Sequence, residues 1–207
     1  MFYQFKGNEE IAHSYIICRF GQCLLIDPSF DYEKIIEKLG PNQLQGILLT
    51  HAHHDHVALI HMFKVPIYIH EFDASLLFED QYNGFSKLNP RQYKRKDLNL
   101  VMIQDDTKIP LADKFVQVIH TPGHTKGSVS FLYENYLFTG DTLFKDSVGR
   151  HDLYSGNLFE LKKSVLKIVD SIHPNTTIYP GHDDASTIRN ERKMNPFYIK
   201  WKKQGKI

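Results

Sequence analysis

The run Thr50-His51-Ala52-His53-His54-Asp55-His56 follows directly on an apolar segment, Gly46-Ile47-Leu48-Leu49. Closely spaced imidazoles and a carboxylate, placed in a loop after a short buried strand, predict half of a site for two metal ions. Neutral imidazole and carboxylate are ligands that zinc accepts readily, and iron and manganese accept them too.

The other half of the predicted site lies further along the chain. His124 is in the segment 121–125 (Thr-Pro-Gly-His-Thr), Asp141 in 139–142 (Thr-Gly-Asp-Thr) and His182 in 179–183 (Tyr-Pro-Gly-His-Asp). Each of the three follows an apolar stretch and sits in a turn that contains glycine. We therefore expect these side chains to gather at one end of a sheet.

Two ions about 3.5–4 Å apart can share one hydroxide and hold both ends of a reacting group. Their mutual repulsion requires an anionic bridge, and Asp141 is the natural candidate because a carboxylate can offer one oxygen to each ion. The carboxylates Asp55 and Asp141 are the candidate catalytic residues. The predicted ligands of two divalent ions, zinc first, with iron or manganese also fitting, are His51, His53, Asp55, His56, His124, Asp141 and His182.

The remaining histidines carry a simpler interpretation. A lone histidine near a strand end is usually hydrogen-bonded or solvated, so we expect no ligand role for His13, His61, His70, His120 and His173. His54 lies inside the cluster, but its neighbours occupy the ligand spacing, so it is left out of the predicted site.

The order of these motifs resembles the metallo-β-lactamase superfamily, whose first metal motif reads H-x-H-x-D-H, and the resemblance covers nearly the whole chain. Asp27, in Leu24-Leu25-Ile26-Asp27-Pro28, is similar to the early strand-ending aspartate of that family. Several stretches are similar to the glyoxalase II-like branch, and above all to its short single-domain hydrolases. These stretches are 121–128 (Thr-Pro-Gly-His-Thr-Lys-Gly-Ser), 140–144 (Gly-Asp-Thr-Leu-Phe), 149–152 (Gly-Arg-His-Asp), Glu191-Arg192 and Asn195-Pro196-Phe197.

The resemblance implies a role for each site residue. One ion would be held by His51, His53 and His124, and the second by Asp55, His56 and His182. Asp141 would bridge the two ions. Asp27 and Thr50 would support the fold or orient the ligands from behind, as outer partners of metal ligands commonly do.

Two features of this sequence differ from the glyoxalase II-like branch. His151 stands where the branch usually has threonine in a G-R-T-D loop, and we interpret it as a tolerated surface change. Two-domain glyoxalase II enzymes end in a helical domain that helps to bind glutathione, whereas this chain ends soon after Trp201. The resemblance therefore implies thioester chemistry without implying lactoylglutathione as the natural substrate.

The expected function is that of a metal-dependent hydrolase of thioesters, similar to hydroxyacylglutathione hydrolase. A hydroxide held between the two ions would attack the carbonyl carbon, and one ion would stabilise the oxyanion. A thiolate leaves without a proton, whereas an amine must be protonated as it departs. A site without a dedicated general acid thus favours thioesters over β-lactams.

Three alternatives stay open at this point. A persulfide dioxygenase shares the glycine-arginine-x-aspartate loop and binds one iron through two histidines and an aspartate, for which His51 or His53, His124 and Asp141 are the candidates. A lactonase or β-lactamase is a second hydrolytic alternative. A metal-binding protein without catalysis ranks last, because no motif is degraded.

Composition limits the classes of protein to which this chain can belong. A chain of 207 residues with 42% hydrophobic and 24% charged residues is typical of a globular protein, and its net charge of +1 provides no general attraction for nucleic acid or anionic membranes. We find no run of about 20 apolar residues and no signal peptide. The expected partner is a small thioester or ester molecule, and the pattern does not address the oligomeric state.

The two cysteines are expected to be unbridged. A turn at Gly21-Gln22 would pair Phe20 with Cys23 and Cys18 with Leu25, so that the cysteines do not face each other. Both are then small buried apolar residues, and a reducing cytoplasm is the expected compartment.

Strand and helix patterns alternate along the chain and predict one α+β domain over residues 1–207. The resemblance adds a four-layer αβ/βα sandwich with the ligand loops at one edge. The segment Gln81 to Leu98 is a candidate loop over the site, and its basic run Arg91 to Lys96 is expected to be solvated. The expected helices are Tyr32 to Leu39, one from Val57, Asn157 to about Asp170 and one from Glu191; the expected strands are Ser14 to Phe20, Cys23 to Ile26, Gly46 to Leu49, Val65 to Ile69, Phe115 to Ile119, Val129 to Tyr133, Tyr136 to Phe138 and Ile178 to Tyr179.

Overall fold

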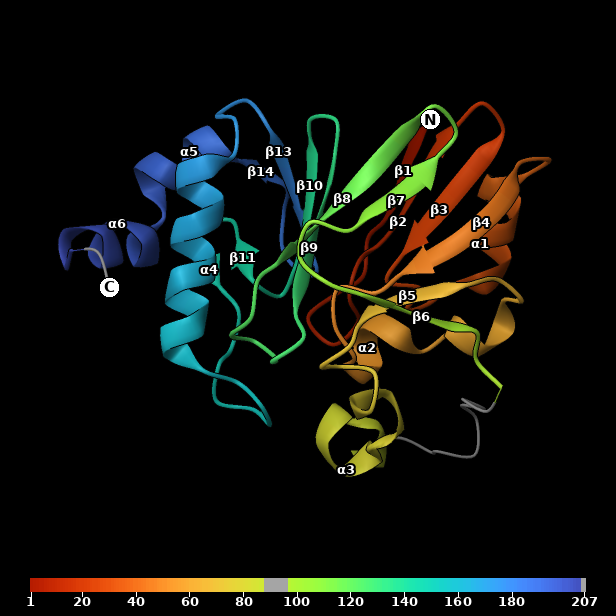
Figure 1. Cartoon of the computed structure of the whole chain (residues 1–207), viewed down its shortest axis with the longest axis horizontal. Helices are drawn as coiled ribbons and strands as arrows, with labels where there is room; N and C mark the ends of the chain where they lie inside the picture. Colours follow the sequence, from red (N-terminus) through yellow and green to blue (C-terminus); the bar gives the residue numbers. More distant parts are fainter. Residues whose placement is uncertain (88–96, 206–207) are drawn as a thin grey trace.

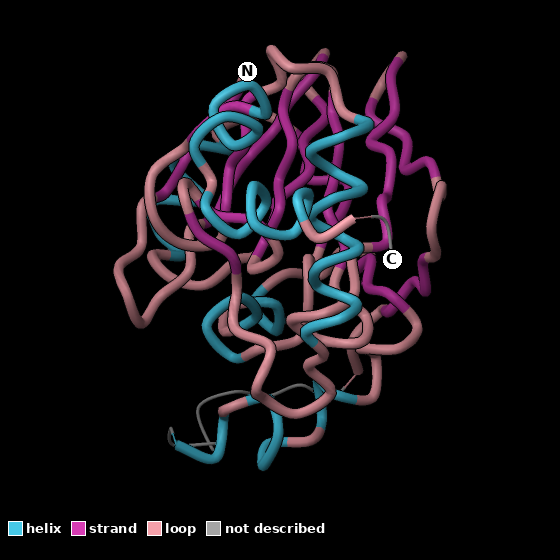
Figure 2. The backbone as a smooth tube through the Cα atoms, turned by 90° about the vertical axis from the view of Figure 1, so that its left-hand side faces the viewer, coloured by secondary structure: helices cyan, strands magenta, loops and turns pink. Residues whose placement is uncertain are grey.

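Two six-stranded sheets pack face to face and carry helices on their outer faces (Figure 1). The computed structural model describes residues 1–87 and 97–205. Figure 2 looks onto the side that carries the C-terminal helices and shows them lying over the strands behind. The predicted α+β fold with αβ/βα layering is confirmed.

The first sheet is built from the N-terminal half of the chain, in the order β1-β2-β3-β4-β5-β6. Strands β1 to β3 pair antiparallel, and β3 to β6 pair parallel. The carboxyl ends of the parallel strands therefore lie at one edge. The strands are β1 (Phe2–Phe5), β2 (Ser14–Arg19), β3 (Gln22–Ile26), β4 (Gln43–Leu48), β5 (Ile67–His70) and β6 (Leu100–Ile103).

The second sheet has the order β14-β13-β10-β9-β8-β7. Strands β10 and β13 are parallel, and β8 runs the same way because both β8 and β10 pair antiparallel with β9. The ends of β8, β10 and β13 thus meet at one edge. The strands are β7 (Lys108–Leu111), β8 (Lys114–His120), β9 (Val129–Tyr133), β10 (Tyr136–Gly140), β13 (Thr177–Pro180) and β14 (Ser186–Thr187), with a separate small hairpin of β11 (Leu143–Phe144) and β12 (Ser147–Val148).

Helix ends follow the capping residues in the sequence. The Asp31 side chain accepts a hydrogen bond from the Lys34 amide at the start of α1, and Asn157 accepts from the Phe159 and Glu160 amides at the start of α4. The helices are α1 (Tyr32–Leu39), α2 (His54–Val57), α3 (Asp80–Asn83), α4 (Leu158–Ser171), α5 (Ile188–Met194) and α6 (Pro196–Lys203), with 3-10 turns η1 (Ile60–Met62), η2 (Leu76–Phe78) and η3 (Phe85–Lys87).

Both faces of the central strands are buried, which explains their nearly continuous apolar sequences. In β2, Ile16 packs into the core beneath α1, whereas Ile17 points into the core between the two sheets. A third core, with Leu161 and Ile168 of α4, lies between the second sheet and the C-terminal helices. This alternation places three apolar layers between four structural layers.

The β2–β3 hairpin differs from the prediction. Its turn is at Phe20 and Gly21, which both have positive φ (47° and 78°), as a tight two-residue hairpin turn requires. The predicted turn was one residue further along the chain. Moving it back changes every cross-strand pair, and Cys18 comes directly opposite Cys23.

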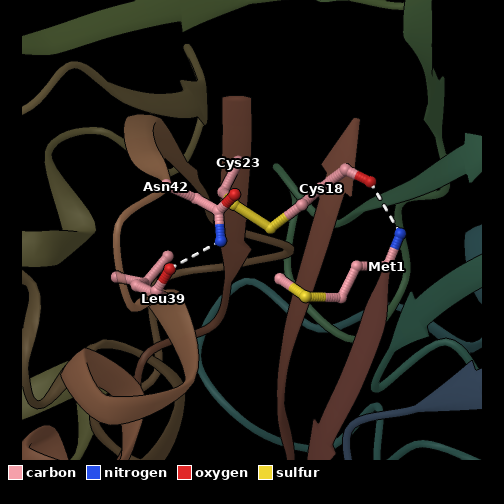
Figure 3. The surroundings of a disulfide bond; sticks show 5 residues. All are labelled: Met1, Cys18, Cys23, Leu39 and Asn42. Carbon is pink, nitrogen blue, oxygen red and sulfur yellow. Dashed lines mark hydrogen bonds between the residues drawn. A yellow bond between two sulfur atoms is a disulfide. The ribbon is translucent and has the colours of Figure 1, made fainter. Parts of the chain in front are cut away.

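Cys18 and Cys23 form a disulfide, with their Cα atoms 4.1 Å apart (Figure 3). Both are buried, as expected, but the expectation of two unbridged cysteines is wrong. The argument for a reducing cytoplasm loses its premise with it. The Met1 amino group donates to the Cys18 carbonyl oxygen at 2.8 Å and so fixes the start of β1 beside this bridge.

Several elements were not predicted or begin elsewhere. Strand β1 and the edge strands β6, β7 and β14 are too short or too mixed in polarity to show a clear pattern. The last helical region begins at Ile188, not Glu191, because Thr187 caps it, and Asn195-Pro196 divides it into α5 and α6. The helix expected from Val57 instead covers His54–Val57.

Part of the segment predicted as a loop over the site, including the basic run Arg91 to Lys96, lies outside the described residues. Within the described ranges, no helix combines the length and apolar character that crossing a membrane requires.

Candidate metal centre

The sequence-predicted ligands lie at the edge of the sandwich where the strands of both sheets end. The loop after β4 leads into α2 and carries His51 to His56. The turns after β8, β10 and β13 carry His124, Asp141 and His182. In Figure 1 this is the lower edge of the sheets, close to α2.

His51, His53 and His124 form one group of donors. One side-chain nitrogen of each lies within 4.8 Å of the others, and all three residues are buried. The ring centroids are 4.6 to 4.7 Å apart, with the His51 ring nearly perpendicular to the other two. Three imidazoles would hold an ion without filling its coordination, as a catalytic ion requires.

Asp55, His56 and His182 form a second group within the same 4.8 Å limit. The His182 Nε2 atom lies 3.1 Å from Asp55 Oδ2. His182 comes from the opposite sheet, so this group also joins the two halves of the sandwich.

Asp141 lies between the two groups. Its Oδ1 is 3.3 Å from His56 Nε2, and its Oδ2 is 3.6 Å from His124 Nε2. The two oxygens thus face different groups of donors. Gly140 makes this position accessible: its φ is 48°, and a Cβ there would lie 2.4 Å from the Thr50 hydroxyl oxygen.

Three donor atoms that face this centre are buried and have no hydrogen-bond partner among the described residues: His51 Nε2, His56 Nε2 and Asp141 Oδ1. His53 turns its Nδ1 to the centre, 2.8 Å from His124 Nε2. Buried polar atoms in proteins are nearly always satisfied, because an unpaired one is costly. Divalent cations would supply the missing partners for these three atoms. The residues present therefore fit a metal centre.

The ionisation states favour metal binding. Burial lowers the pKa of His51, and it lowers the pKa of His53 to about 3, so both imidazoles are neutral. Burial would raise the pKa of Asp55, but the His56 charge and the His182 hydrogen bond outweigh it and hold that pKa at about 2. Neutral imidazole and ionised carboxylate are the forms that bind metal.

His56 is the exception in the metal-free protein. Burial would lower its pKa, but the carboxylates Asp141, Asp55 and Asp27 outweigh burial and raise it. The same interaction keeps the pKa of Asp141 well below its ordinary value, against the effect of burial. A cation that binds here would replace the proton of His56.

Asp27 and Thr50 hold the ligands from behind. Asp27 Oδ1 accepts the Thr50 amide at 2.8 Å, and Oδ2 accepts the Thr50 hydroxyl at 2.6 Å and His56 Nδ1 at 2.8 Å. The Thr50 hydroxyl oxygen is in turn 3.1 Å from His51 Nδ1. This chain of hydrogen bonds places protons on the Nδ1 atoms and leaves each Nε2 for the centre.

Backbone carbonyls fix two further histidines. His124 Nδ1 donates to the Arg150 carbonyl oxygen at 2.7 Å, and His182 Nδ1 donates to that of Asn8 at 3.0 Å. A carbonyl oxygen can only accept, so both rings carry their proton on Nδ1 and present Nε2.

Asp73 was missed by the sequence analysis. It is fully buried between two ligand loops: Oδ2 accepts the Ala52 amide (3.1 Å) and the Thr125 hydroxyl (2.7 Å), and Oδ1 accepts the Gly127 amide (2.8 Å). Burial raises its pKa. The available signal was its place three residues after a buried strand, which resembles the position of Asp27.

We expect Asp73→Ala to weaken binding at the His51, His53 and His124 group by about 10–100-fold, because this carboxylate holds both loops that carry the group. Zinc affinity measured by chelator competition should show one weakened ion and one retained ion per chain. Asp113→Ala, which removes an exposed carboxylate paired with Arg19 between β7 and β8, is the matched control. Equal loss of both ions, or no loss, would contradict the assignment.

The other histidines have different surroundings. His13 Nδ1 accepts the Gly7 amide at 2.9 Å, and its Nε2 donates to the Asp183 carbonyl oxygen at 2.8 Å. His70 and His120 stack on each other with ring centroids 4.1 Å apart. Among the described residues, these three and His54, His61 and His173 are outside the donor groups.

A cavity of about 570 Å³ opens over the donors. Its floor includes His53, Asp55, His124 and Asp141. Its walls come from both halves of the molecule and include His54, Tyr82, Phe144, Arg150, Asp152 and Tyr154. A small molecule can therefore reach the centre.

Known proteins share this fold and chain length. An uncharacterised protein of Aquifex aeolicus is 40% identical over 86% of both chains, and the probable metallo-hydrolase YqgX of Bacillus subtilis is 30% identical over 90% of this chain and 92% of its own. The crystal structure of the B3 metallo-β-lactamase BLEG-1 matches with a TM-score of 0.83 at 32% identity, covering 96% of this chain and 99% of that one. The di-iron-bound form of TTHA1623 matches with a TM-score of 0.80 at 29% identity, covering 94% and 99%.

The αβ/βα fold and a histidine-rich centre at its edge define a class of metal-dependent proteins. Residues 7–182 match the family model of the metallo-β-lactamase superfamily. The chain belongs to this superfamily, whose members bind divalent metal ions.

Proposed function

We propose that this protein is a metal-dependent hydrolase of thioesters, of the glyoxalase II-like branch, and that residues 1–207 form a single hydrolase domain. The observation that supports it most is the arrangement of six donor residues around Asp141, with three buried donor atoms at the centre that lack a partner in the described structure.

The proposed ligand set divides at Asp141. One divalent ion would be held by His51, His53 and His124, and a second by Asp55, His56 and His182. Two such ions, zinc in the first instance, would polarise a carbonyl group and lower the pKa of a bound water. Asp141 joins the two sites, since its oxygens face different groups of donors.

The protein's own residues orient these donors. Asp27 and Thr50 set the rings of His51 and His56, and the Arg150 and Asn8 carbonyl oxygens set those of His124 and His182. The carboxylates Asp55 and Asp141 are the proposed catalytic residues, because they stay ionised beside the reacting group. They can position a water molecule by accepting its hydrogen bond.

Thioester chemistry suits this set of groups. A thiolate departs without a proton, so no dedicated general acid is needed, whereas an amine leaving group requires one. Residues in the stretches similar to the glyoxalase II-like branch make buried or partly buried hydrogen bonds. The Thr125 hydroxyl and the Gly127 amide donate to Asp73. Glu191 accepts hydrogen bonds from the Asp146 amide and the Asn195 side chain.

The test is thiol release from S-lactoylglutathione by purified protein. We expect release by the metal-loaded protein, loss after chelation, and recovery with zinc or manganese. No release by fully metal-loaded protein from any acyl thioester would overturn the proposal and leave the metal centre itself standing.

A persulfide dioxygenase is the second candidate, favoured by one observation: Arg150 and Asp152, from the loop shared with that activity, line the cavity. It needs a single iron, for which His51 or His53, His124 and Asp141 are the donors. Oxygen consumption with glutathione persulfide by iron-loaded protein, without thiol release from thioesters, would select it.

A further inference from the structure

Tyr82 and Tyr154 stack on each other at the wall of the cavity over the metal centre. Their ring centroids are 4.0 Å apart and their planes differ by 15°. Tyr82 belongs to α3, which lies between β5 and β6 of the first sheet in the chain, and Tyr154 belongs to the loop between β12 and α4. The stacked pair therefore bridges the two halves of the molecule beside the donors.

The α3 side of the pair is held firmly. The buried Asn83 side chain donates to the Leu76 and Leu77 carbonyl oxygens at 2.8 and 3.2 Å and accepts the Phe85 amide at 3.0 Å. Gly84 has a φ of 92° and packs against His54, where a Cβ would lie 2.4 Å from Nδ1. The position of Tyr82 is thus fixed relative to the metal loop.

The Tyr154 side is held independently. The neighbouring Ser155 hydroxyl accepts the Lys126 amide at 3.1 Å, and the Asn157 amide donates to the Gly123 carbonyl oxygen at 2.8 Å. Both partners flank His124 in the sequence. Each tyrosine is therefore tied to a loop that carries donors of the His51, His53 and His124 group.

The pair keeps apolar surface for a ligand. Tyr82 is 40% and Tyr154 is 48% exposed, although each contacts the other ring. Leu153 and Phe144 line the same cavity. Aromatic surface held in place before binding costs little ordering entropy when a ligand arrives, so it is effective in selecting substrates.

A second cavity, of about 590 Å³, adjoins the first and has no tyrosine, phenylalanine or leucine in its described lining. It shares Glu9 and His182 with the first and is otherwise lined by charged and polar groups that include Lys6, Lys145, Asp183 and Asp184. A thioester centred on the donors can thus direct a charged thiol carrier to one side and its acyl group to the tyrosines.

We propose that Tyr82 and Tyr154 are a specificity-determining pair that binds an apolar, and preferably aromatic, acyl group of the substrate. The inference rests on the proposed thioesterase function and names its acyl class. The hydroxyl groups are not required, because the stacked rings provide the contact.

The experiment compares S-phenylacetylglutathione with S-acetylglutathione as substrates of the metal-loaded protein. We expect kcat/KM to favour the phenylacetyl substrate, and this preference to fall about tenfold in Tyr82→Ala and in Tyr154→Ala, the size expected for one aromatic contact. The double variant should lose little more than either single variant, since the rings act as a pair. Activity on the acetyl substrate and metal content should stay near those of the unaltered protein.

Tyr82→Phe should keep the preference, and so should Phe159→Ala, which removes a ring that is 49% exposed on α4 and is not among the described lining residues of this cavity. An unchanged preference in both alanine variants would overturn the inference. A rise in phenylacetyl activity would overturn it too, because the pair would then exclude bulky groups. The tyrosines lie on different elements, so a variant that misfolds at one position leaves the other to decide.

A binding measurement separates this inference from the proposed function. S-benzylglutathione and S-methylglutathione are thioethers without the carbonyl carbon that the proposed reaction attacks, and calorimetry gives their affinities directly. A benzyl preference that disappears in the tyrosine variants supports the pair even if no thioester is hydrolysed. Equal affinity for both thioethers in the unaltered protein would contradict it.

Discussion

Asp141→Ala protein is expected to bind metal poorly and to lose activity by about 10²–10³-fold or more, the scale seen when one main electrostatic group is removed from an active site. Among the described residues, Asp141 is the carboxylate whose oxygens face both donor groups, at 3.3 Å from His56 Nε2 and 3.6 Å from His124 Nε2. Without it, two cations would repel each other with no anion between them. Metal content by mass spectrometry and thiol release would be measured on the same preparation.

Asp106→Ala is the matched control for this variant, because it removes an exposed carboxylate that accepts a hydrogen bond from the Gln117 side chain at 3.0 Å and belongs to neither donor group. It should keep full metal content and turnover. Near-normal turnover of Asp141→Ala at unchanged metal content would contradict the bridging role.

Asp27→Ala should have the second largest effect, on both stability and metal binding. The change leaves the buried Thr50 amide, the Thr50 hydroxyl and His56 Nδ1 without their acceptor. We expect the free energy of unfolding to fall by about 3 kcal/mol, and zinc affinity to fall about 10–100-fold. Chemical denaturation and chelator competition measure the two quantities.

Asp31→Ala is the control that tests whether the losses of stability and zinc affinity come from the hydrogen bonds of Asp27 to Thr50 and His56. Asp31 is exposed and caps α1 through the Lys34 amide, so its loss should cost about 1 kcal/mol and leave zinc affinity unchanged. Asp27→Ala protein with normal zinc affinity would show that this carboxylate does not orient the ligands.

Much of the fold could be predicted because its central strands are buried on both faces and its helices have clear caps. Asp31 and Asn157 each mark a helix start that the structure confirms. The hairpin register could not be predicted with the same success. Its turn places Phe20 in a left-handed conformation, which a large aromatic residue rarely adopts, and this choice brings Cys18 opposite Cys23.

The candidate site was predictable where the donors follow apolar strands, since strand ends that meet at one edge bring distant residues together. Asp73 was not predicted, because its role depends on the loops that carry Ala52 and Gly127 meeting in three dimensions. The pairing of Tyr82 with Tyr154 was not predicted for the same reason. The two residues are 72 positions apart in the sequence, but their ring centroids are 4.0 Å apart in the structure.

Titration of metal-free protein with zinc tests the central claim most directly, with thiol release from a thioester followed at each addition. A centre divided at Asp141 predicts that activity rises to a plateau at two equivalents of zinc per chain. A plateau at one equivalent, or no thiol release at any metal content, would contradict a two-metal thioester hydrolase.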